Sequence, residues 1–268
     1  MSETDSESRC SLHRMSDVMT EQSETVGPAV RRDRWIVRSI RFVGWASIWV
    51  GLFLLGFVVH QLFVTTFLAQ QNNERLEAEA EEYFATVEFT EVPYVASGVP
   101  EPADPEDVLP DVPLPVPTIK VEPAPVAHEA FAIIRVPSLD RLETGWAIVE
   151  GVSRKDLKNG VGHMPSTPLP GQPGNSVFSG HRTTYGAPFH EFDELDPGDI
   201  IEVETGIGIH RYQVRETMIV RPTEVWVTQP RDGAWITLTT CNPKFSSRER
   251  LVVVAELVGG PNFEAISG

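Results

Sequence analysis

An uncharged apolar run from Phe42 to about Ala69 most constrains what this chain can fold into. A helix needs about 20 such residues to cross the hydrocarbon core of a bilayer, and this run is longer. It is too long for the apolar region of a signal peptide and starts too far into the chain. Trp35, Trp45 and Trp49 gather near its start, as aromatic residues do at a membrane interface. The sequence therefore predicts a transmembrane helix over residues 35–69.

The charges on either side of this run predict its orientation. Five arginines lie within residues 31–41, before the run, whereas residues 74–82, after it, are mostly acidic. The positive-inside rule then places the N-terminus in the cytoplasm and residues 70–268 outside the cell. Residues 1–34 are rich in Ser, Thr, Glu and Asp, so we predict a disordered cytoplasmic tail. The chain is expected to be a single-pass protein of the cell membrane.

Residues 70–128 have the composition of an extracellular stalk and linker. Residues 74–86 favour a helix that extends the membrane helix outward, and ten of the 22 prolines lie between Val92 and Pro125. Prolines mixed with Asp and Glu favour an extended, polyproline-like spacer. At about 3.1 Å per residue such a spacer reaches on the order of 100 Å. It would lift a domain into the cell wall; a passive linker is the alternative.

The folded domain is expected over residues 129–260, with a short C-terminal tail over residues 261–268. Its pattern is a series of short runs rich in Val, Ile, Thr and aromatic residues, separated by Gly and Pro turns. This pattern predicts an all-β fold, namely a closed β-barrel of about eight strands with short helices. The expected strands are residues 130–136, 146–150, 176–179, 199–203, 210–220, 235–240 and 251–257, and the expected helices are residues 154–159 and 191–195.

One cysteine in the expected external domain indicates chemistry. Cys10 lies in the cytoplasmic tail and Cys241 outside, so the two cannot form a disulfide. A lone thiol in an exported domain suggests a reactive role. Residues 235–240 alternate as a strand does, which puts Cys241 at the strand's end, before Asn242-Pro243. The alternative is an inert, buried cysteine.

A histidine and an arginine are candidate partners of this thiol. We select His181, within Gly-His-Arg after an apolar strand, and rank His190 second. Arg250 heads the last strand and lies beside Cys241 if that strand pairs with residues 235–240. Arg248 remains an alternative, because strand alternation places both arginines on the same face. The five histidines beyond the membrane run are His128, His163, His181, His190 and His210.

A thiol, an imidazole and a guanidinium together suit acyl transfer. The thiolate is the attacking form, and a neighbouring cation stabilises it. Attack on a peptide carbonyl builds negative charge on oxygen, which a guanidinium and backbone N–H groups can hold. The imidazole can protonate the departing amine. A zinc site is a weaker interpretation, because no Cys-x-x-Cys or His-x-x-x-His spacing supports it.

Three separated motifs resemble those of the sortases, and the resemblance covers roughly residues 131–257. Thr237-Leu238-Thr239-Thr240-Cys241 matches the sortase signature Thr-Leu-x-Thr-Cys. Gly180-His181-Arg182, with the Phe-His-Glu-Phe and Pro-Gly-Asp segments that follow, is similar to the sortase histidine region. Arg250 lies at a spacing from the cysteine that several sortase classes use. Cys-Asn-Pro-Lys-Phe-Ser and Gly-Gln-Pro-Gly-Asn look most like class E sortases of high-GC Gram-positive bacteria.

The resemblance implies a cysteine transpeptidase with Cys241 as nucleophile, His181 as general acid/base and Arg250 as oxyanion or substrate-positioning group. Thr239 and Thr240 are the expected substrate contacts; no cofactor is expected, and no acidic cluster is distinctive enough to assign metal ligands. The expected reaction cleaves a Leu-Pro-x-Thr-Gly or Leu-Ala-x-Thr-Gly-like sorting signal after Thr, through a thioacyl intermediate. The secreted protein then passes to an amine of peptidoglycan or its lipid-linked precursor.

Two other functions remain open for the same residues. One is a hydrolytic cysteine peptidase, in which water resolves the thioacyl intermediate. The other is a non-catalytic module near the cell wall, in which Cys241 is structural. Nucleic acid is not an expected partner, because the net charge of the chain is −16.

Overall fold

The computed structural model describes residues 29–95 and 116–267. Most of the expected cytoplasmic tail, Cys10 included, and the centre of the proline-rich segment lie outside these residues. The contacts within the chain divide it into two units, residues 1–57 and residues 58–268.

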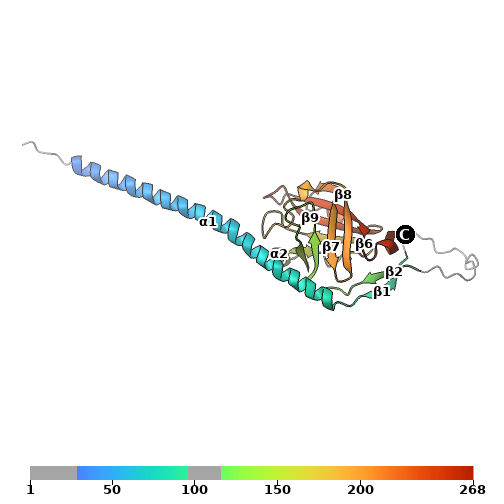
Figure 1. Cartoon of the computed structure of the whole chain (residues 1–268). Helices are drawn as coiled ribbons and strands as arrows, with labels where there is room; N and C mark the ends of the chain where they lie inside the picture. Colours follow the sequence, from blue (N-terminus) through green and yellow to red (C-terminus); the bar gives the residue numbers. More distant parts are fainter. Residues whose placement is uncertain (1–28, 96–115, 268) are drawn as a thin grey trace, which may run out of the picture. The chain divides into compact units, whose positions relative to one another are not determined.

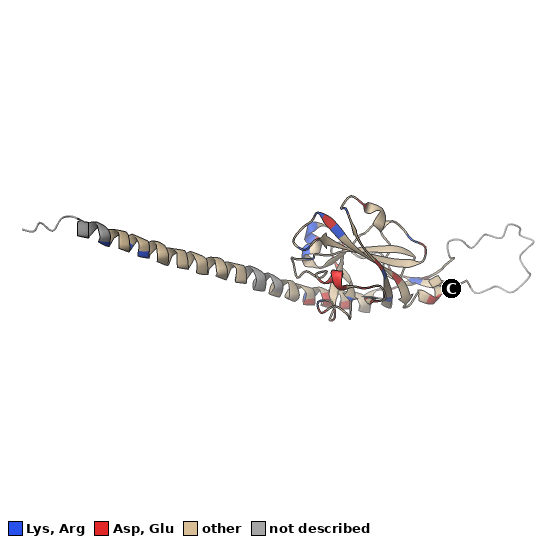
Figure 2. Ribbon diagram, turned by 90° about the horizontal axis from the view of Figure 1, so that it is seen from above, with Lys and Arg blue, Asp and Glu red and all other residues tan. Residues whose placement is uncertain are grey.

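One long helix, α1 (Ala29–Thr86), carries the apolar run (Figure 1). Its segment Arg34–His60 is long and apolar enough to cross a membrane, and none of it is buried against other parts of the protein. Basic residues lie near the start of α1 and acidic residues near its end (Figure 2). These features match the predicted membrane helix in position and in flanking charge.

Residues 130–259 form the predicted closed barrel of eight strands, in the order β10-β8-β7-β3-β4-β5-β6-β9. Strands β4 and β5 pair in parallel, as do β6 and β9, and the other neighbours are antiparallel. The seven predicted strands all form. The strands are β3 (Ala130–Arg135), β4 (Trp146–Glu150), β5 (Val161–His163), β6 (Gly174–Ser179), β7 (Ile200–Thr205), β8 (Gly208–Val220), β9 (Ala234–Asn242) and β10 (Glu249–Gly259).

The short helices and one missed strand complete the barrel. Helix α2 (Arg154–Asn159) forms where it is predicted, and Ser153 caps it with a capping box. The single-turn helices are η1 (Phe192–Glu194), within the predicted 191–195, and η2 (Val225–Thr228). Strand β5 was not predicted because three residues are too few to show an alternating pattern.

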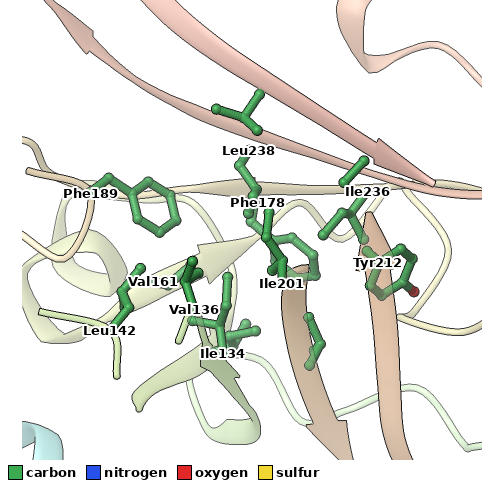
Figure 3. Packing of buried hydrophobic residues seen from close by; sticks show 14 of the residues in the cluster. Ile134, Val136, Leu142, Val161, Phe178, Phe189, Ile201, Tyr212, Ile236 and Leu238 are labelled. Atoms are coloured by element: carbon green, nitrogen blue, oxygen red, sulfur yellow. The ribbon is translucent and has the colours of Figure 1, made fainter. Parts of the chain in front are cut away.

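Side chains alternate between the interior of the barrel and its outer face. Phe178 of β6 and Leu238 of β9 belong to the interior core (Figure 3). Val253 of β10 belongs to the same core. Val252 and Val254 of β10 instead pack on the outside with Val227 of η2 and with side chains of β8 and β9. Because the period of a strand is two, this alternation assigns a face to every neighbouring position of β6, β9 and β10.

The C-terminal part of α1 packs against the barrel instead of standing apart as a stalk. Leu76 and Ala80, one helical turn apart, bury their side chains against β3 and β4. The Asn73 side chain accepts a hydrogen bond from the Ala147 N–H at 2.9 Å. Glu79 accepts one from the Ala130 N–H at 3.0 Å. The predicted helix over 74–86 is present, but the folded unit starts well before the predicted boundary at residue 129.

The ends of the proline-rich segment lie side by side. Strand β1 (Thr90–Pro93) pairs antiparallel with β2 (Thr118–Val121), and the Tyr94 N–H donates to the Pro117 carbonyl at 2.8 Å. The residues between these two strands lie outside the described ranges, so the extended spacer stays a prediction. The pairing of its ends was not expected, since strands of four residues beside prolines left no signal in the sequence.

The chain after the barrel is also ordered against it. Asn262 is buried and exchanges two hydrogen bonds with the Lys120 backbone of β2, at 2.8 and 2.9 Å. A short helix, α3 (Phe263–Ser267), follows, and its Phe263 and Ile266 pack against the core. The described residues of the expected C-terminal tail thus contact the folded domain.

A buried carboxyl, Glu122, follows β2. Only 4% of this residue is exposed, and neither carboxylate oxygen finds a hydrogen-bond partner of good geometry among the described residues. Burial raises the pKa of Glu122 to about 7, and polar contacts with Thr205 and the Gly206 and Ile207 backbone offset burial only in part. Between about pH 4.5 and pH 7 the folded state therefore holds a proton that the unfolded chain releases, so the free energy of unfolding falls as pH rises.

We expect Glu122→Gln to be more stable than the parent at pH 8, by up to about 3 kcal/mol, and no more stable at pH 4. The amide of glutamine is neutral at both pH values, so the variant does not lose stability as pH rises. Thermal unfolding of the full-length protein in detergent at the two pH values measures the difference. Glu129→Gln, at an exposed carboxyl, is the matched control and should change little. A destabilised Glu122→Gln at pH 8 would mean that the ionised carboxylate is well solvated or paired.

Candidate active site

Cys241 lies next to last in β9, as predicted, and is a free, half-buried cysteine. Ile236 and Leu238 of the same strand point into the interior core. Alternation therefore places Cys241 on the outer face of the barrel. The rigid strand holds the thiol beside the loop of residues 243–248, where β9 gives way to β10.

Arg250 is the register partner of Cys241 across the β9–β10 ladder. Residues directly opposite each other in an antiparallel pair point to the same face, with Cβ atoms about 5 Å apart. The Arg250 Nη1 donates to the carbonyls of Ser247 (3.1 Å) and Glu249 (2.9 Å), which hold the guanidinium beside the loop. Arg248 precedes β10 and is exposed. The register favours Arg250 over Arg248.

His181 follows β6 by two residues and comes level with Cys241. Strands β6 and β9 run in parallel, with Ser179 opposite Thr239. The pairing continues beyond β6, because the Gly180 N–H donates to the Thr239 carbonyl at 3.1 Å. One more step along both chains brings His181 to the level of Cys241. Phe178 points inward, so alternation puts His181 on the outer face too.

The His181 imidazole is half-buried beside Tyr185. Their ring centroids are 5.0 Å apart, and the Lys158 Nζ lies 5.5 Å from the centre of the Tyr185 ring. Burial lowers the pKa of His181 below its usual value of 6.5, so the neutral imidazole predominates at pH 7. A hollow of about 320 Å³ adjoins this ring. It is lined by Arg154, Leu157, Lys158, His181 and Tyr185.

The two threonines before Cys241 have different environments. Thr239 lies on the outer face, with its Oγ1 2.9 Å from the Ser179 Oγ. Thr240 is buried, and its hydroxyl donates to the Gly180 carbonyl at 2.8 Å. Thr240 therefore fastens the end of β6 to β9. Its inward position does not fit the predicted substrate contact, whereas that of Thr239 does.

The other four histidines beyond the membrane run lie in other environments. The His163 Nδ1 meets the Glu150 carboxylate at 2.6 Å inside the barrel, and His128 pairs with Asp156 at 2.7 Å. His210 is fully buried. The His190 Nδ1 lies 2.8 Å from the Arg182 carbonyl. Within the described ranges, no group of three or more His, Cys, Asp or Glu side chains could hold a metal ion.

Apolar side chains are exposed at two segments of this end of the barrel. Val225 and Trp226 are exposed on η2, whose Val227 packs on the outer face of β10. Phe245, at the tip of the loop between β9 and β10, is 87% exposed. Both segments therefore present apolar side chains to solvent.

Two residues beside His181 were given no role from the sequence. The Tyr185 ring packs against the imidazole at a tilt of 45°, and Arg182 is a buried arginine that contacts the Cys241 backbone. The only signal in the sequence was the Gly-His-Arg tripeptide, which marks Arg182 but does not indicate which way its side chain points. Tyr185 lies in a loop, and no periodicity relates it to His181.

Comparison with known proteins identifies the barrel. The family model described as a sortase domain matches residues 134–258. This part of the chain is a sortase domain. The match covers β3 from Ile134 through β10 as far as Val258, so it contains all three candidate catalytic residues.

Two named relatives of the chain are sortases. Sortase SrtE1 of Streptomyces coelicolor is 34% identical over 146 residues, which is 48% of this chain and 41% of that protein. Sortase D of Bacillus subtilis is 32% identical over 120 residues, which is 44% of this chain and 58% of the relative. The chain thus spans about half the length of these relatives. The solved structure of sortase E from Streptomyces avermitilis is 34% identical to this chain. The match covers 52% of this chain and 94% of the chain in that structure, with a TM-score of 0.46.

Proposed function

We propose that this protein is a membrane-anchored cysteine transpeptidase in which Cys241 is the nucleophile, His181 the general acid/base and Arg250 the oxyanion or substrate-positioning group. One observation carries the proposal. The registers of β6 with β9 and of β9 with β10 bring these three side chains to one end of the barrel, on its outer face. Membership of a family of cysteine transpeptidases supports the same roles.

The first half of the reaction forms a thioester. Neutral His181 takes the proton of the Cys241 thiol, and the thiolate attacks the carbonyl carbon of the scissile peptide bond. Negative charge develops on the carbonyl oxygen, where the Arg250 guanidinium and backbone N–H groups stabilise it. The imidazolium then protonates the nitrogen of the departing segment, the C–N bond breaks, and the acyl group stays on sulfur.

The second half transfers the acyl group to an amine. The acceptor amine attacks the thioester carbon and loses a proton to neutral His181. The C–S bond breaks, the new amide leaves, and the Cys241 thiolate regains its proton from the imidazolium. Each turnover therefore exchanges one amine for another and restores both side chains.

We infer that the substrate is a secreted protein with a Leu-Pro-x-Thr-Gly or Leu-Ala-x-Thr-Gly-like sorting signal, cleaved between Thr and Gly. The acceptor would be an amine of peptidoglycan or its lipid-linked precursor. Thr239 and the exposed apolar groups of η2 are suited to contact the signal. Arginines before the apolar segment and acidic residues after it support a cytoplasmic N-terminus and an extracellular barrel.

The test is a cleavage and ligation assay with the full-length protein in detergent. A peptide bearing the signal is offered with and without an amine acceptor such as triglycine. We expect a ligated product whose yield rises with acceptor concentration. Hydrolysis that ignores the acceptor would indicate a peptidase, and a bound but uncleaved peptide would indicate the non-catalytic module.

A further inference from the structure

A buried arginine lies beneath the candidate active site. Arg182 follows His181 directly and is only 3% exposed. Its Nη1 donates to the Asn242 Oδ1 at 2.6 Å and to the Cys241 carbonyl at 3.3 Å. Its Nη2 pairs with the Asp193 Oδ1 at 2.9 Å. One guanidinium thus joins the segment that carries His181 to the segment that carries Cys241.

The same chain of contacts reaches the third candidate residue. Asn242 is the register partner of Glu249 across the β9–β10 ladder, and its Nδ2 donates to the Glu249 Oε2 at 2.9 Å. Glu249 directly precedes Arg250 in β10. The side chains of Arg182, Asn242 and Glu249 therefore form one continuous line of contacts.

Each member of this line is the immediate neighbour in sequence of a candidate catalytic residue. Because neighbouring residues of a strand point to opposite faces, Asn242 and Glu249 lie on the face opposite to Cys241 and Arg250, and Arg182, which follows the end of β6, contacts Asn242. A shift of any one of them moves the backbone that carries its neighbour. Contacts on the inner side can therefore hold the spacing of groups on the outer side.

We propose that Arg182, acting through Asn242 and Glu249, is a positioning residue that holds His181, Cys241 and Arg250 in register for acyl transfer. This inference rests on the proposed function and extends it to residues that touch neither substrate nor the reacting atoms. The line of contacts takes no part in proton transfer. Its role is to keep the three reacting groups at fixed separations.

The charges in this region suit a buried anchor. Asp193 also pairs with the Lys244 Nζ at 3.2 Å, in the loop after Cys241. Burial alone would raise the pKa of Asp193, but the hydrogen bonds from Arg182 and Lys244 outweigh it and lower the pKa. The carboxylate is therefore ionised at neutral pH and balances the buried guanidinium.

Only arginine can make this set of contacts. The Arg182 fork reaches two acceptors with Nη1 and a third with Nη2, in a planar arrangement. The ammonium of a lysine would keep the charge but could not reach all three acceptors from one position. Arg182→Lys therefore removes the geometry and keeps the charge balance with Asp193.

The first test compares steady-state kinetics of the full-length parent and Arg182→Lys in the ligation assay. A misplacement of about 1 Å can lower a rate about 10²-fold. We expect kcat to fall about 10- to 100-fold, while KM for the signal peptide stays within about threefold of the parent. Arg135→Lys, in the Arg135–Glu204 ion pair between β3 and β7, is the matched control and should keep the parent kcat.

The second test uses Glu249, at a half-exposed position where folding is less at risk. Glu249→Ala removes the acceptor of the Asn242 amide and should lower kcat several-fold. Glu249→Gln keeps an acceptor oxygen and should restore most of the rate. A purely structural role would lower the melting temperature of both variants without this rescue.

The outcomes separate this inference from the proposed function. A parent protein that ligates no peptide contradicts the proposed function. An active parent whose Arg182→Lys variant folds and keeps the parent kcat overturns the positioning role alone. If Arg182→Lys does not fold, the two Glu249 variants decide. The positioning role is overturned if Glu249→Ala keeps the parent kcat. It is also overturned if Glu249→Gln is as slow as Glu249→Ala.

Discussion

Cys241→Ala is expected to abolish cleavage and ligation of a sorting-signal peptide, with kcat lower by about 10⁴-fold or more. Without the sulfur no thioacyl intermediate forms, and removal of a nucleophile is among the largest single losses in enzymes. Intact-protein mass spectrometry of the parent with peptide alone should show an adduct of the segment that ends in Thr. The variant should show none.

The other cysteine of the chain provides the matched control for this experiment. Cys10 is the only other thiol in the sequence, so Cys10→Ala should keep the adduct and the parent rate. The loss in Cys241→Ala should not come from unfolding, because a half-buried cysteine contributes little packing. Ligation by Cys241→Ala at the parent rate would instead support the non-catalytic module, and loss of the adduct in Cys10→Ala would move the nucleophile to the other thiol.

The sequence predicts the barrel well because its strands follow one rule. Alternating Val, Ile, Thr and aromatic runs between Gly and Pro turns mark seven of the eight strands. The pairing of β10 with β9 could be expected from the short loop between them, and it brings Arg250 opposite Cys241. The exact register decides between Arg250 and Arg248, and no local pattern specifies it.

Prediction from the sequence missed the contacts that a segment makes with residues far away in the chain. The stalk interpretation of residues 74–86 rested on helix propensity, which says nothing about the contacts of Leu76 and Ala80 with the barrel. The spacer prediction rested on proline content, which does not indicate that β1 pairs with β2, a strand far along the chain.

The same limit applies within the site. Thr239 and Thr240 look alike in the motif, yet one lies on the outer face and the other donates a hydrogen bond inside. Arg182 is part of a recognised tripeptide, but its role depends on Asp193 and Asn242, which are 11 and 60 residues further along the chain. Motifs identify chemistry, and the fold decides which of their members reach it.

His181→Gln is expected to lower kcat/KM by about 10²- to 10⁴-fold, because an amide can neither take the thiol proton nor protonate the departing amine. His190→Gln is the matched control. Its imidazole contacts the Arg182 carbonyl, and glutamine retains an N–H donor for that contact, so the variant should stay within about tenfold of the parent. The reverse ranking would assign the acid/base role to His190.

The dependence of kcat/KM on pH is a second, independent test of the acid/base role of His181. Burial lowers the pKa of its imidazole, so the neutral form persists to a more acidic pH than for a free histidine. As pH falls through this lowered pKa, the imidazole gains a proton and can no longer accept one from Cys241. The acid limb of the parent profile should therefore have its midpoint below pH 6.5, and His181→Gln should lose that limb. A midpoint above 6.5, or a limb that persists in His181→Gln, would show that another group accepts the thiol proton.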